Sequence, residues 1–351
     1  MAVYKIFPTK DATLYSAYPS MNTGVDSILE VSNTNPNISP SPRVARSLLQ
    51  FDINDINEVV DNIIMSNNYV SNLKLYIAEA QGIVQNTTLE VNLVTEEWNN
   101  GNGQYGDSPN TTNGVSWEYR LSSGSGEWVA PGGDIALTPP TVTQSFDYRS
   151  SKDLNIDVTT GVNIIHSSSS RNDDSFLIKL TGSQEFNSDL DIQPTFKFFS
   201  VDTNTIYPPT LEFKWDDSVY STTLSVISTS DVFIALDNNP GVFQPESVSR
   251  FRLNVRPEFP VRTFQTSSIY TSNYALPESS YYAIKDLDTN EYVIDFDENY
   301  TKISCDNTSN YFDLYMNGLE PERYYKILIQ TLINGNIIIQ DKNYIFKVVN
   351  G

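Results

Sequence analysis

The chain has 351 residues, a formal net charge of −21 at pH 7, one cysteine and one histidine. The negative charge argues against nucleic acid as a partner, because phosphate contacts need clustered lysine and arginine. One cysteine excludes an internal disulfide framework, and one histidine leaves little material for a zinc site or a histidine-based hydrolase.

The first part of the chain predicts antiparallel strands. Residues 4–51 alternate apolar and polar side chains in runs that turn residues separate, and the proline-rich residues 33–45 predict a loop. Residues 55–65 are the one plausible helix. The alternation resumes after it, with Leu73, Leu75 and Ile77 on one face of a strand and Leu89, Val91 and Leu93 on one face of the next.

Residues 98–134, called the Trp loop below, contain three of the four tryptophans among runs of Gly, Asn, Ser and Pro. Such runs sustain no helix and scarcely form a strand, while the rings argue against disorder. Two interpretations stay open. In one, the rings fasten the loop to the sheet beneath it. In the other, they form an exposed platform on which a sugar ring stacks, and the candidate residues are Trp98, Tyr105, Trp117, Tyr119 and Trp128.

Short strands follow the Trp loop. They are predicted at residues 142–148, 154–158, 176–180 and 195–199, and the segment TIYPPTLEFKW closes the set. Many short strands with Gly and Pro turns are typical of a β-sandwich or jelly roll. We therefore predict an N-terminal domain over residues 1–217.

The order of these segments resembles the jelly-roll domain of the DNRLRE type. The resemblance covers about residues 3 to 217 and rests on DATLYSAYPSMNTG, RSLLQFDI, LKLYIAEA, the Trp loop, LNIDVTTGV, FLIKL and PPTLEFKW. It implies a fold similar to carbohydrate-binding modules and a glycan-binding ancestry without a defined site. It also implies a structural calcium ion, for which Asp11 and Asp157 lie at family-like positions near strand ends. The alternative is that both carboxylates cap turns.

A cluster of arginines follows in an otherwise acidic chain. Arg250 and Arg252 alternate with apolar residues, which places both arginines on one face of a strand. Two interpretations stay open, namely ion pairs within the chain and an interface with another protein, where arginine is enriched. The candidate interface residues are Arg250, Arg252, Arg256 and Arg262.

Residues 218–351 predict a second β-domain. Its strands are expected at residues 281–285, 292–295, 311–316, 324–332 and 344–349, with hairpin turns at Asp-Thr-Asn and Asn-Gly-Asn. The phrase GLEPERYYKILIQ resembles immunoglobulin-like or fibronectin-like sandwiches, and the stretch from RFRLNVRPEFP onward resembles virion structural proteins of tailed phages with AT-rich genomes. The predicted fold is therefore all-β, an N-terminal jelly-roll β-sandwich followed by a smaller immunoglobulin-like or fibronectin-like β-sandwich.

The sequence predicts a protein without enzymatic activity. It contains no phosphate loop, paired-cysteine motif or His-Glu-x-x-His helix, and adjacent carboxylates mean little in so acidic a chain. No apolar stretch has membrane-spanning length, and the first residues do not form a secretory signal. A jelly roll of this type normally acts outside cells, and lysis is a route out that requires no signal.

These observations predict a structural protein of a tailed-phage particle, in the tail, baseplate or neck or as a capsid decoration. We expect assembly in the host cytoplasm, several copies in a symmetric arrangement, other virion proteins as partners, and neither nucleic acid nor membrane. The alternative is a glycan-binding module that engages host surface polysaccharide through the Trp loop. No cofactor is expected beyond the calcium ion that the resemblance implies.

Overall fold

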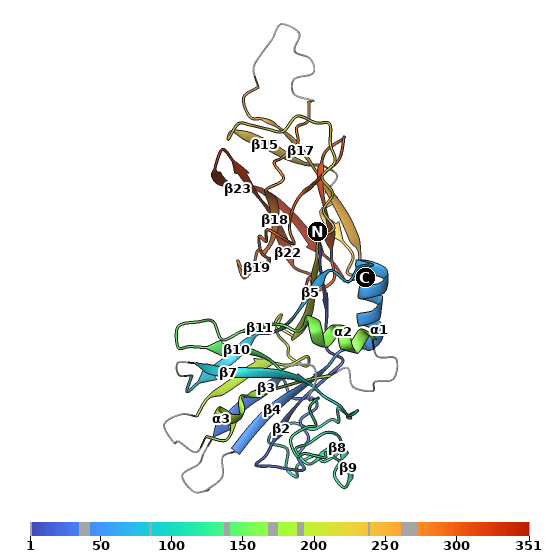
Figure 1. Cartoon of the computed structure of the whole chain (residues 1–351), viewed down its shortest axis with the longest axis vertical. Coiled ribbons are helices and arrows are strands. Elements are labelled where there is room, and N and C mark those ends of the chain that lie inside the picture. Colours follow the sequence, from blue (N-terminus) through green and yellow to red (C-terminus); the bar gives the residue numbers. More distant parts are fainter. Residues whose placement is uncertain are drawn as a thin grey trace. The chain divides into compact units, whose positions relative to one another are not determined.

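The computed structural model describes residues 2–34, 43–83, 86–136, 141–167, 175–187, 193–237, 239–260 and 272–350. The fold is all-β, as predicted, with 46% of residues in strands and 8% in helices. Packing divides the chain into an N-terminal unit, Lys5–Glu212, and a C-terminal unit formed by Met1–Tyr4 with Phe213–Gly351 (Figure 1). The sequence predicted this boundary after residue 217.

Two main sheets make up most of the described N-terminal unit. The larger has eight strands, in the order β10 (Val142–Phe146), β7 (Thr87–Leu93), β12 (Ser175–Leu180), β4 (Arg43–Gln50), β3 (Ile28–Thr34), β13 (Thr195–Phe199) and β6 (Ile77–Gln81), and β2 (Lys10–Tyr15) also pairs with β4. The smaller has the order β1 (Ala2–Ile6), β14 (Thr210–Trp215), β5 (Tyr69–Leu75) and β11 (Leu154–Asp157). The unit boundary falls within β1 and β14.

The helices of the described residues are short and lie in the N-terminal unit. The predicted helix forms as α1 (Ile53–Asn57) and the π-helical η1 (Glu58–Ile64), where the Asp52 side chain accepts the Asn54 backbone N–H. Two further helices are α2 (Thr159–Ser167) and α3 (Gly182–Glu185). Within the described ranges, no helix is long and apolar enough to span a membrane.

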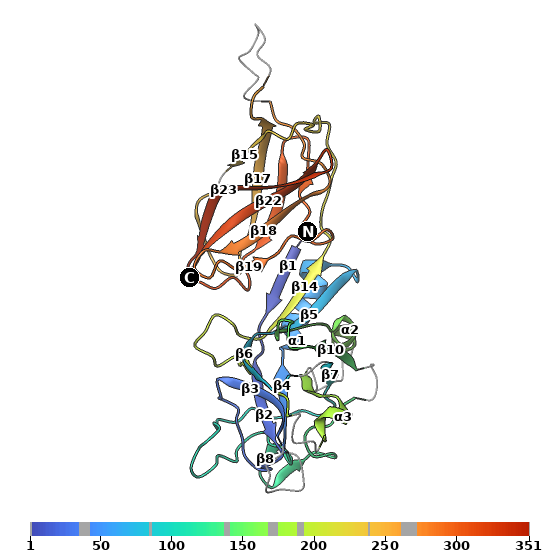
Figure 2. The same cartoon turned by 90° about the vertical axis from the view of Figure 1, so that its left-hand side faces the viewer.

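The Trp loop contains a small hairpin that the sequence did not predict. β8 (Tyr119–Ser122) pairs with β9 (Ser125–Glu127), and the turn between them contains Gly124 at φ 81°. Glycine adopts such a φ without the strain that a side chain would add, so this polar segment forms strands after all. Figures 1 and 2 place β8 near β2 at one end of the large sheet.

Two facing sheets form the C-terminal unit. One has the order β15 (Val232–Asp237), β17 (Val248–Pro257), β21 (Asn310–Tyr315) and β20 (Ser304–Cys305), and the other β16 (Val242–Phe243), β23 (Asn336–Val348), β22 (Tyr324–Ile333), β18 (Ser280–Asp286) and β19 (Tyr292–Ile294). Side chains from both sheets share one apolar core, in which the Tyr282 and Phe312 rings stack at 4.1 Å. This arrangement is a β-sandwich.

The β22–β23 hairpin differs from its predicted form. Its turn is Asn334-Gly335, with φ values of 52° and 77°, as expected for an Asn-Gly hairpin turn. The last strand was expected to begin at residue 344, yet β23 already begins at Asn336. The register shifts between Ile327 and Ile329 of β22, so an irregularity separates the two halves of this long strand.

Candidate functional site

Trp98 and Trp128 are buried beneath the Trp loop. Their side chains are 1% and 4% exposed and pack in one apolar cluster with strand residues of the large sheet. The Trp98 indole N–H donates to Ser175 Oγ at 2.9 Å, and the Trp128 indole N–H donates to the Ser116 carbonyl at 3.0 Å. Because both faces of these rings are covered, they offer no surface on which a sugar could stack.

Trp117 is half-buried and lies against an arginine. The Arg46 guanidinium is 5.0 Å from the Trp117 ring centroid. It also forms two bonds with the Glu185 carboxylate, at 2.6 and 3.0 Å, and donates to the Gly132 carbonyl at 2.9 Å. These contacts hold the guanidinium on the ring, so a sugar would have to displace it. Tyr119 is half-buried in β8.

Two side chains that the sequence analysis did not identify hold the loop backbone. Buried Asn22 donates to the carbonyls of Asn100 and Val115, at 2.7 and 2.8 Å, and accepts the Gly103 N–H at 2.8 Å. Asp134 accepts the backbone N–H groups of residues 129 and 130. Since a loop lacks ladder hydrogen bonds, such side chains satisfy its buried polar groups. Asn and Asp are common in turns, so no sequence signal marked these two.

Tyr105 is the predicted platform residue that is well exposed, at 55%. Its ring lies 5.1 Å from Tyr15 and 6.2 Å from Tyr18. These three tyrosines with Glu30 and Arg43 line a hollow of about 100 Å³, called the tyrosine hollow below. The structure thus brings Tyr105 together with residues of β2, β3 and β4 rather than with the tryptophans.

The tyrosine hollow offers donors and acceptors next to exposed rings. Glu30 accepts the Ser32 hydroxyl at 2.6 Å and the Tyr15 hydroxyl at 3.4 Å. Burial raises the pKa of Tyr105 and of Tyr15, and both phenols are neutral at pH 7, as an unperturbed tyrosine also is. Rings, a carboxylate and a guanidinium together suit a sugar with its hydroxyls. The hollow is smaller than the roughly 300 Å³ of a typical small-molecule pocket, so it fits the edge of one ring.

Asp11 and Asp157, the two candidate calcium ligands, lie on different sheets, and each accepts hydrogen bonds from within the chain. Asp11, on β2 of the large sheet, is 1% exposed and accepts the Val201 N–H at 2.7 Å. Asp157, on β11 of the other sheet, caps a turn by accepting the N–H and hydroxyl of Thr159 at 2.9 and 2.5 Å. Calcium takes about six to eight oxygen ligands. The residues described here include no group of three or more His, Cys, Asp or Glu side chains able to hold a metal.

Three of the four candidate interface arginines make contacts within the chain. Arg250 binds both carboxylate oxygens of Asp313, at 2.8 and 2.7 Å, and Arg252 binds Asp306 at 2.9 Å. Arg256 lies 4.3 Å from the Phe233 ring centroid. The arginines lie on one face of β17, as predicted, because the apolar residues between them are buried on the other face. Arg262 lies outside the described residues.

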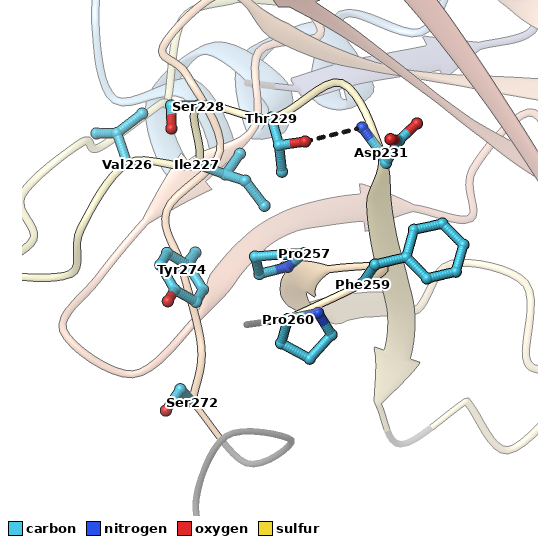
Figure 3. A pocket seen from close by; sticks show the side chains of 10 residues that line it. All are labelled: Val226, Ile227, Ser228, Thr229, Asp231, Pro257, Phe259, Pro260, Ser272 and Tyr274. Carbon is cyan, nitrogen blue, oxygen red and sulfur yellow. Dashed lines mark hydrogen bonds between the residues drawn. The ribbon is translucent and has the colours of Figure 1, made fainter. Parts of the chain in front are cut away.

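A larger pocket, of about 510 Å³, lies in the C-terminal unit. Figure 3 shows it between Ile227 and Thr229 on one side and Pro257, Pro260 and Tyr274 on the other. The lining mixes apolar side chains with the polar Ser228, Thr229, Asp231 and Ser272. Its rim at Pro260 adjoins residues 261–271, which lie outside the described residues, so we assign it no ligand.

The hairpin of the C-terminal unit carries an exposed apolar surface, called the aliphatic edge below. It consists of Leu332, Ile337 and Ile339, which are 41%, 66% and 53% exposed. Leu332 and Ile337 are directly opposite each other on β22 and β23, so they share one face of the sheet. β16 pairs only with Lys347 and Val348 of β23, which leaves Asn336–Gln340 without an outer partner strand in the described part of the chain.

Comparison with known proteins identifies no family. No protein-family model and no curated protein matches the chain, so the DNRLRE-type resemblance is not confirmed. A DUF4785 family protein of Legionella pneumophila is 6% identical with a TM-score of 0.21, over 99% of this chain and 64% of that one. A Parabacteroides merdae β-glucuronidase is 7% identical with a TM-score of 0.20, over 97% and 35%.

A third solved structure is a tripod from the baseplate of bacteriophage Tuc2009. It is 9% identical to this chain with a TM-score of 0.15, and the match covers 100% of both chains. The chain spans less than two thirds of the length of the first two structures. At these TM-scores none of the three likenesses carries an argument about function.

Proposed function

We propose that this protein is a non-enzymatic structural component of a tailed-phage particle, in the tail, baseplate or neck or as a capsid decoration. It is expected in several symmetric copies that contact other virion proteins. The observation that carries the proposal is the aliphatic edge, where three large aliphatic side chains are exposed on β22 and β23 beside an outer strand edge that no strand of the described residues pairs with.

An unpaired strand edge is a template for pairing with another chain, and free-standing proteins usually protect such edges with charges, prolines or bulges. The segment Asn336–Gln340 has no charge and no proline. Exposed aliphatic surface also costs free energy in water. An edge of this composition is therefore favourable where another chain covers it, as in an assembled particle.

The particle itself is suggested by the resemblance of the C-terminal stretch to virion structural proteins of tailed phages. The arginines of β17 do not carry the proposal, because Arg250 and Arg252 are paired within the chain. The single histidine, His166, is half-buried near the end of α2, where its Nε2 lies 2.9 Å from Asp61 Oδ1.

Mass spectrometry of particles purified from the lysate of infected cells tests the proposal. Peptide intensities should place the protein at a fixed ratio to the major capsid and tail proteins, and this ratio should survive a second purification by density. Absence from the particles, with the protein left in the soluble fraction, would overturn the proposal.

The tyrosine hollow supports a second candidate function, binding of a host surface polysaccharide. Exposed Tyr18 and Tyr105 supply rings, and Glu30 and Arg43 supply groups that bond hydroxyls. This site replaces the platform of tryptophans as the place where a sugar would bind.

Retention on columns of neutral and acidic polysaccharide tests this candidate. Tyr105→Ala should weaken the affinity for the polysaccharide about fivefold, since stacking on an exposed ring contributes about 1 kcal/mol. Tyr148→Ala is the matched control, because Tyr148 is 66% exposed and does not line the hollow. Equal retention of the two variants would exclude the tyrosine hollow as a glycan site.

A further inference from the structure

The backbone of the β22–β23 hairpin determines which polar groups its outer edge presents. In a two-residue hairpin, the pair next to the turn exchanges both backbone hydrogen bonds, and so does every second pair after it. Counting from Ile333 paired with Asn336, the N–H and C=O groups of Ile338 and Gln340 face β22. Those of Ile337 and Ile339 therefore face outward, toward the side where no described strand pairs.

The outward edge is short and has defined ends. At one end the Asn334-Gly335 turn closes the hairpin. At the other, the register shift after Gln340 and the positive φ of Asn343, 58°, interrupt the regular ladder. Figures 1 and 2 show β23 beside β22 in this sheet. The flat, unpaired part is thus Asn336–Gln340, with the sequence NIIIQ.

The charge of this edge is unlike that of the whole chain. Asn336–Gln340 carries no charge, and the next two residues, Asp341 and Lys342, cancel in a chain of net charge −21. Asp341 is also paired with Lys326 of β22 at 3.0 Å. Two copies that meet at this edge experience little local electrostatic repulsion. Acidic surfaces elsewhere on the protein would repel the same surfaces of a second copy.

We propose that Asn336–Gln340 pairs in antiparallel register with the same segment of a second copy of this chain, about a two-fold axis at Ile338. This deepens the proposed function and rests on it, because it names a partner for the aliphatic edge. In this register Ile337 faces Ile339 of the second copy and exchanges both backbone hydrogen bonds with it, and the reverse pair does the same. The two five-stranded sheets become continuous.

The register follows from the side chains. Pairing about Ile338 sets isoleucine against isoleucine and leaves Asp341 across from the glycine of the turn, Gly335. A shift of the axis to Ile339 preserves the hydrogen bonds but sets Asp341 against Ile337, which removes water from a charge beside an aliphatic side chain. The apolar register is therefore favoured.

The interface is small. Each copy contributes one short strand with two exposed isoleucines, Ile337 and Ile339, so the buried area is below the roughly 1,200 Å² of a stable standard interface. We expect a dissociation constant on the order of tens of micromolar in solution. Several copies held in one particle would strengthen it through their high effective concentration.

Analytical ultracentrifugation of the full chain, from about 1 µM to several hundred µM, tests the pairing. The wild-type protein should shift from monomer to dimer. Ile339→Lys should raise the dissociation constant at least tenfold, because it places a charge in the interface. Val248→Lys is the matched control, since Val248 is 53% exposed, lies on the other sheet and gives the same change in charge; it should leave the dissociation constant unchanged.

Two further measurements separate pairing from misfolding. Ile337→Pro removes an outward N–H and leaves the ladder with β22 intact, so it should abolish the dimer while the far-ultraviolet circular dichroism stays unchanged. In the wild-type protein, hydrogen exchange at Ile337 and Ile339 should slow as concentration rises. A protein that stays monomeric throughout, or a dimer that tolerates both edge variants, would overturn the inference.

The outcome is separable from that of the proposed function. A monomer in solution that is nevertheless found in purified particles would remove the self-pairing and leave the structural role in place. A dimer that is sensitive to Ile339→Lys but absent from particles would support the pairing and overturn the role in a virion.

Discussion

In the Trp loop and in the β22–β23 hairpin, the exposure of the large side chains is the opposite of what the composition of each segment suggests. The Trp loop is rich in Gly, Asn, Ser and Pro, yet its rings Trp98 and Trp128 are buried. The hairpin has three consecutive isoleucines at residues 337–339, yet Ile337 and Ile339 are exposed. The polarity of a segment therefore does not predict whether its large side chains are covered.

The difference lies in what each backbone can bind. The Trp loop can pack against the large sheet because Asn22 and Asp134 form hydrogen bonds with its backbone. These backbone groups have no partner strand to bond to, since the path of the loop is irregular. The hairpin forms its own ladder and needs no such help, but one side of β23 and one face of its tip meet no second layer of the described structure. A regular element can thus fold locally and still leave apolar surface for a partner.

The largest expected effect on stability concerns Trp98 in the Trp loop. Trp98→Ala should destabilise the N-terminal unit by about 3–5 kcal/mol, because it leaves a cavity and an unpaired Ser175 hydroxyl. Urea unfolding followed by circular dichroism measures this loss. Val129→Ala in the same loop is the control, since Val129 is 91% exposed. A loss below about 1 kcal/mol for Trp98→Ala would mean that the ring does not hold the loop.

A second effect comes from Asp11, a buried carboxyl on β2. Burial raises its pKa from 3.8 to about 7, so at pH 8 the folded state carries a charge that is unfavourable there. As the pH falls from about 7 to about 4, the folded state binds a proton that the unfolded state does not, and this group's penalty disappears. Asp11→Asn should therefore stabilise the protein by up to about 4 kcal/mol at pH 8 and by little at pH 4.

Thermal unfolding of Asp11→Asn and wild type between pH 4 and pH 8 measures this difference. Asp147→Asn is the control, because Asp147 lies in an exposed turn of the same unit. A stabilisation that does not change with pH would show that Asp11 does not titrate in this range.

A smaller effect concerns the hairpin turn. Gly335 has φ 77°, and a Cβ atom built on it meets no atom within 4 Å. Gly335→Ala should therefore cost about 1 kcal/mol through backbone strain alone. Gly182→Ala is the control, since its Cβ would also lie in open space and its φ is not positive. Chemical unfolding measures the stability of both variants. Equal losses of unfolding free energy would contradict this account.

The smallest effect is expected at the aliphatic edge. Ile337→Ser should change the free energy of unfolding by less than about 0.5 kcal/mol in dilute protein, because Ile337 is 66% exposed. Unfolding at low micromolar concentration measures this. A loss comparable with that of Trp98→Ala would mean that the edge is covered within its own chain, and the comparison between the two regions would fail.

Of the predicted sugar platform, only Tyr105 lies in a candidate site, and its neighbours there come from β2, β3 and β4. No local pattern links these segments, because Tyr18 and Tyr105 are 87 residues apart in number (105 − 18). The exposure of a ring is likewise decided by distant contacts, as when Trp98 meets Ser175. The pairing of Arg250 with Asp313 is of the same kind.

The sequence by itself determined the all-β class, the buried face of β17 and the Asn-Gly hairpin, because alternation and turn chemistry act between residues a few positions apart. Only the tertiary structure decided that Trp98 and Trp128 are covered, that Asp11 and Asp157 lie on separate sheets, and that β23 begins at Asn336 with an outer edge that no described strand pairs with. These outcomes depend on which strands pack against each other across the fold. The burial of a side chain is set by such contacts and not by the segment that contains it.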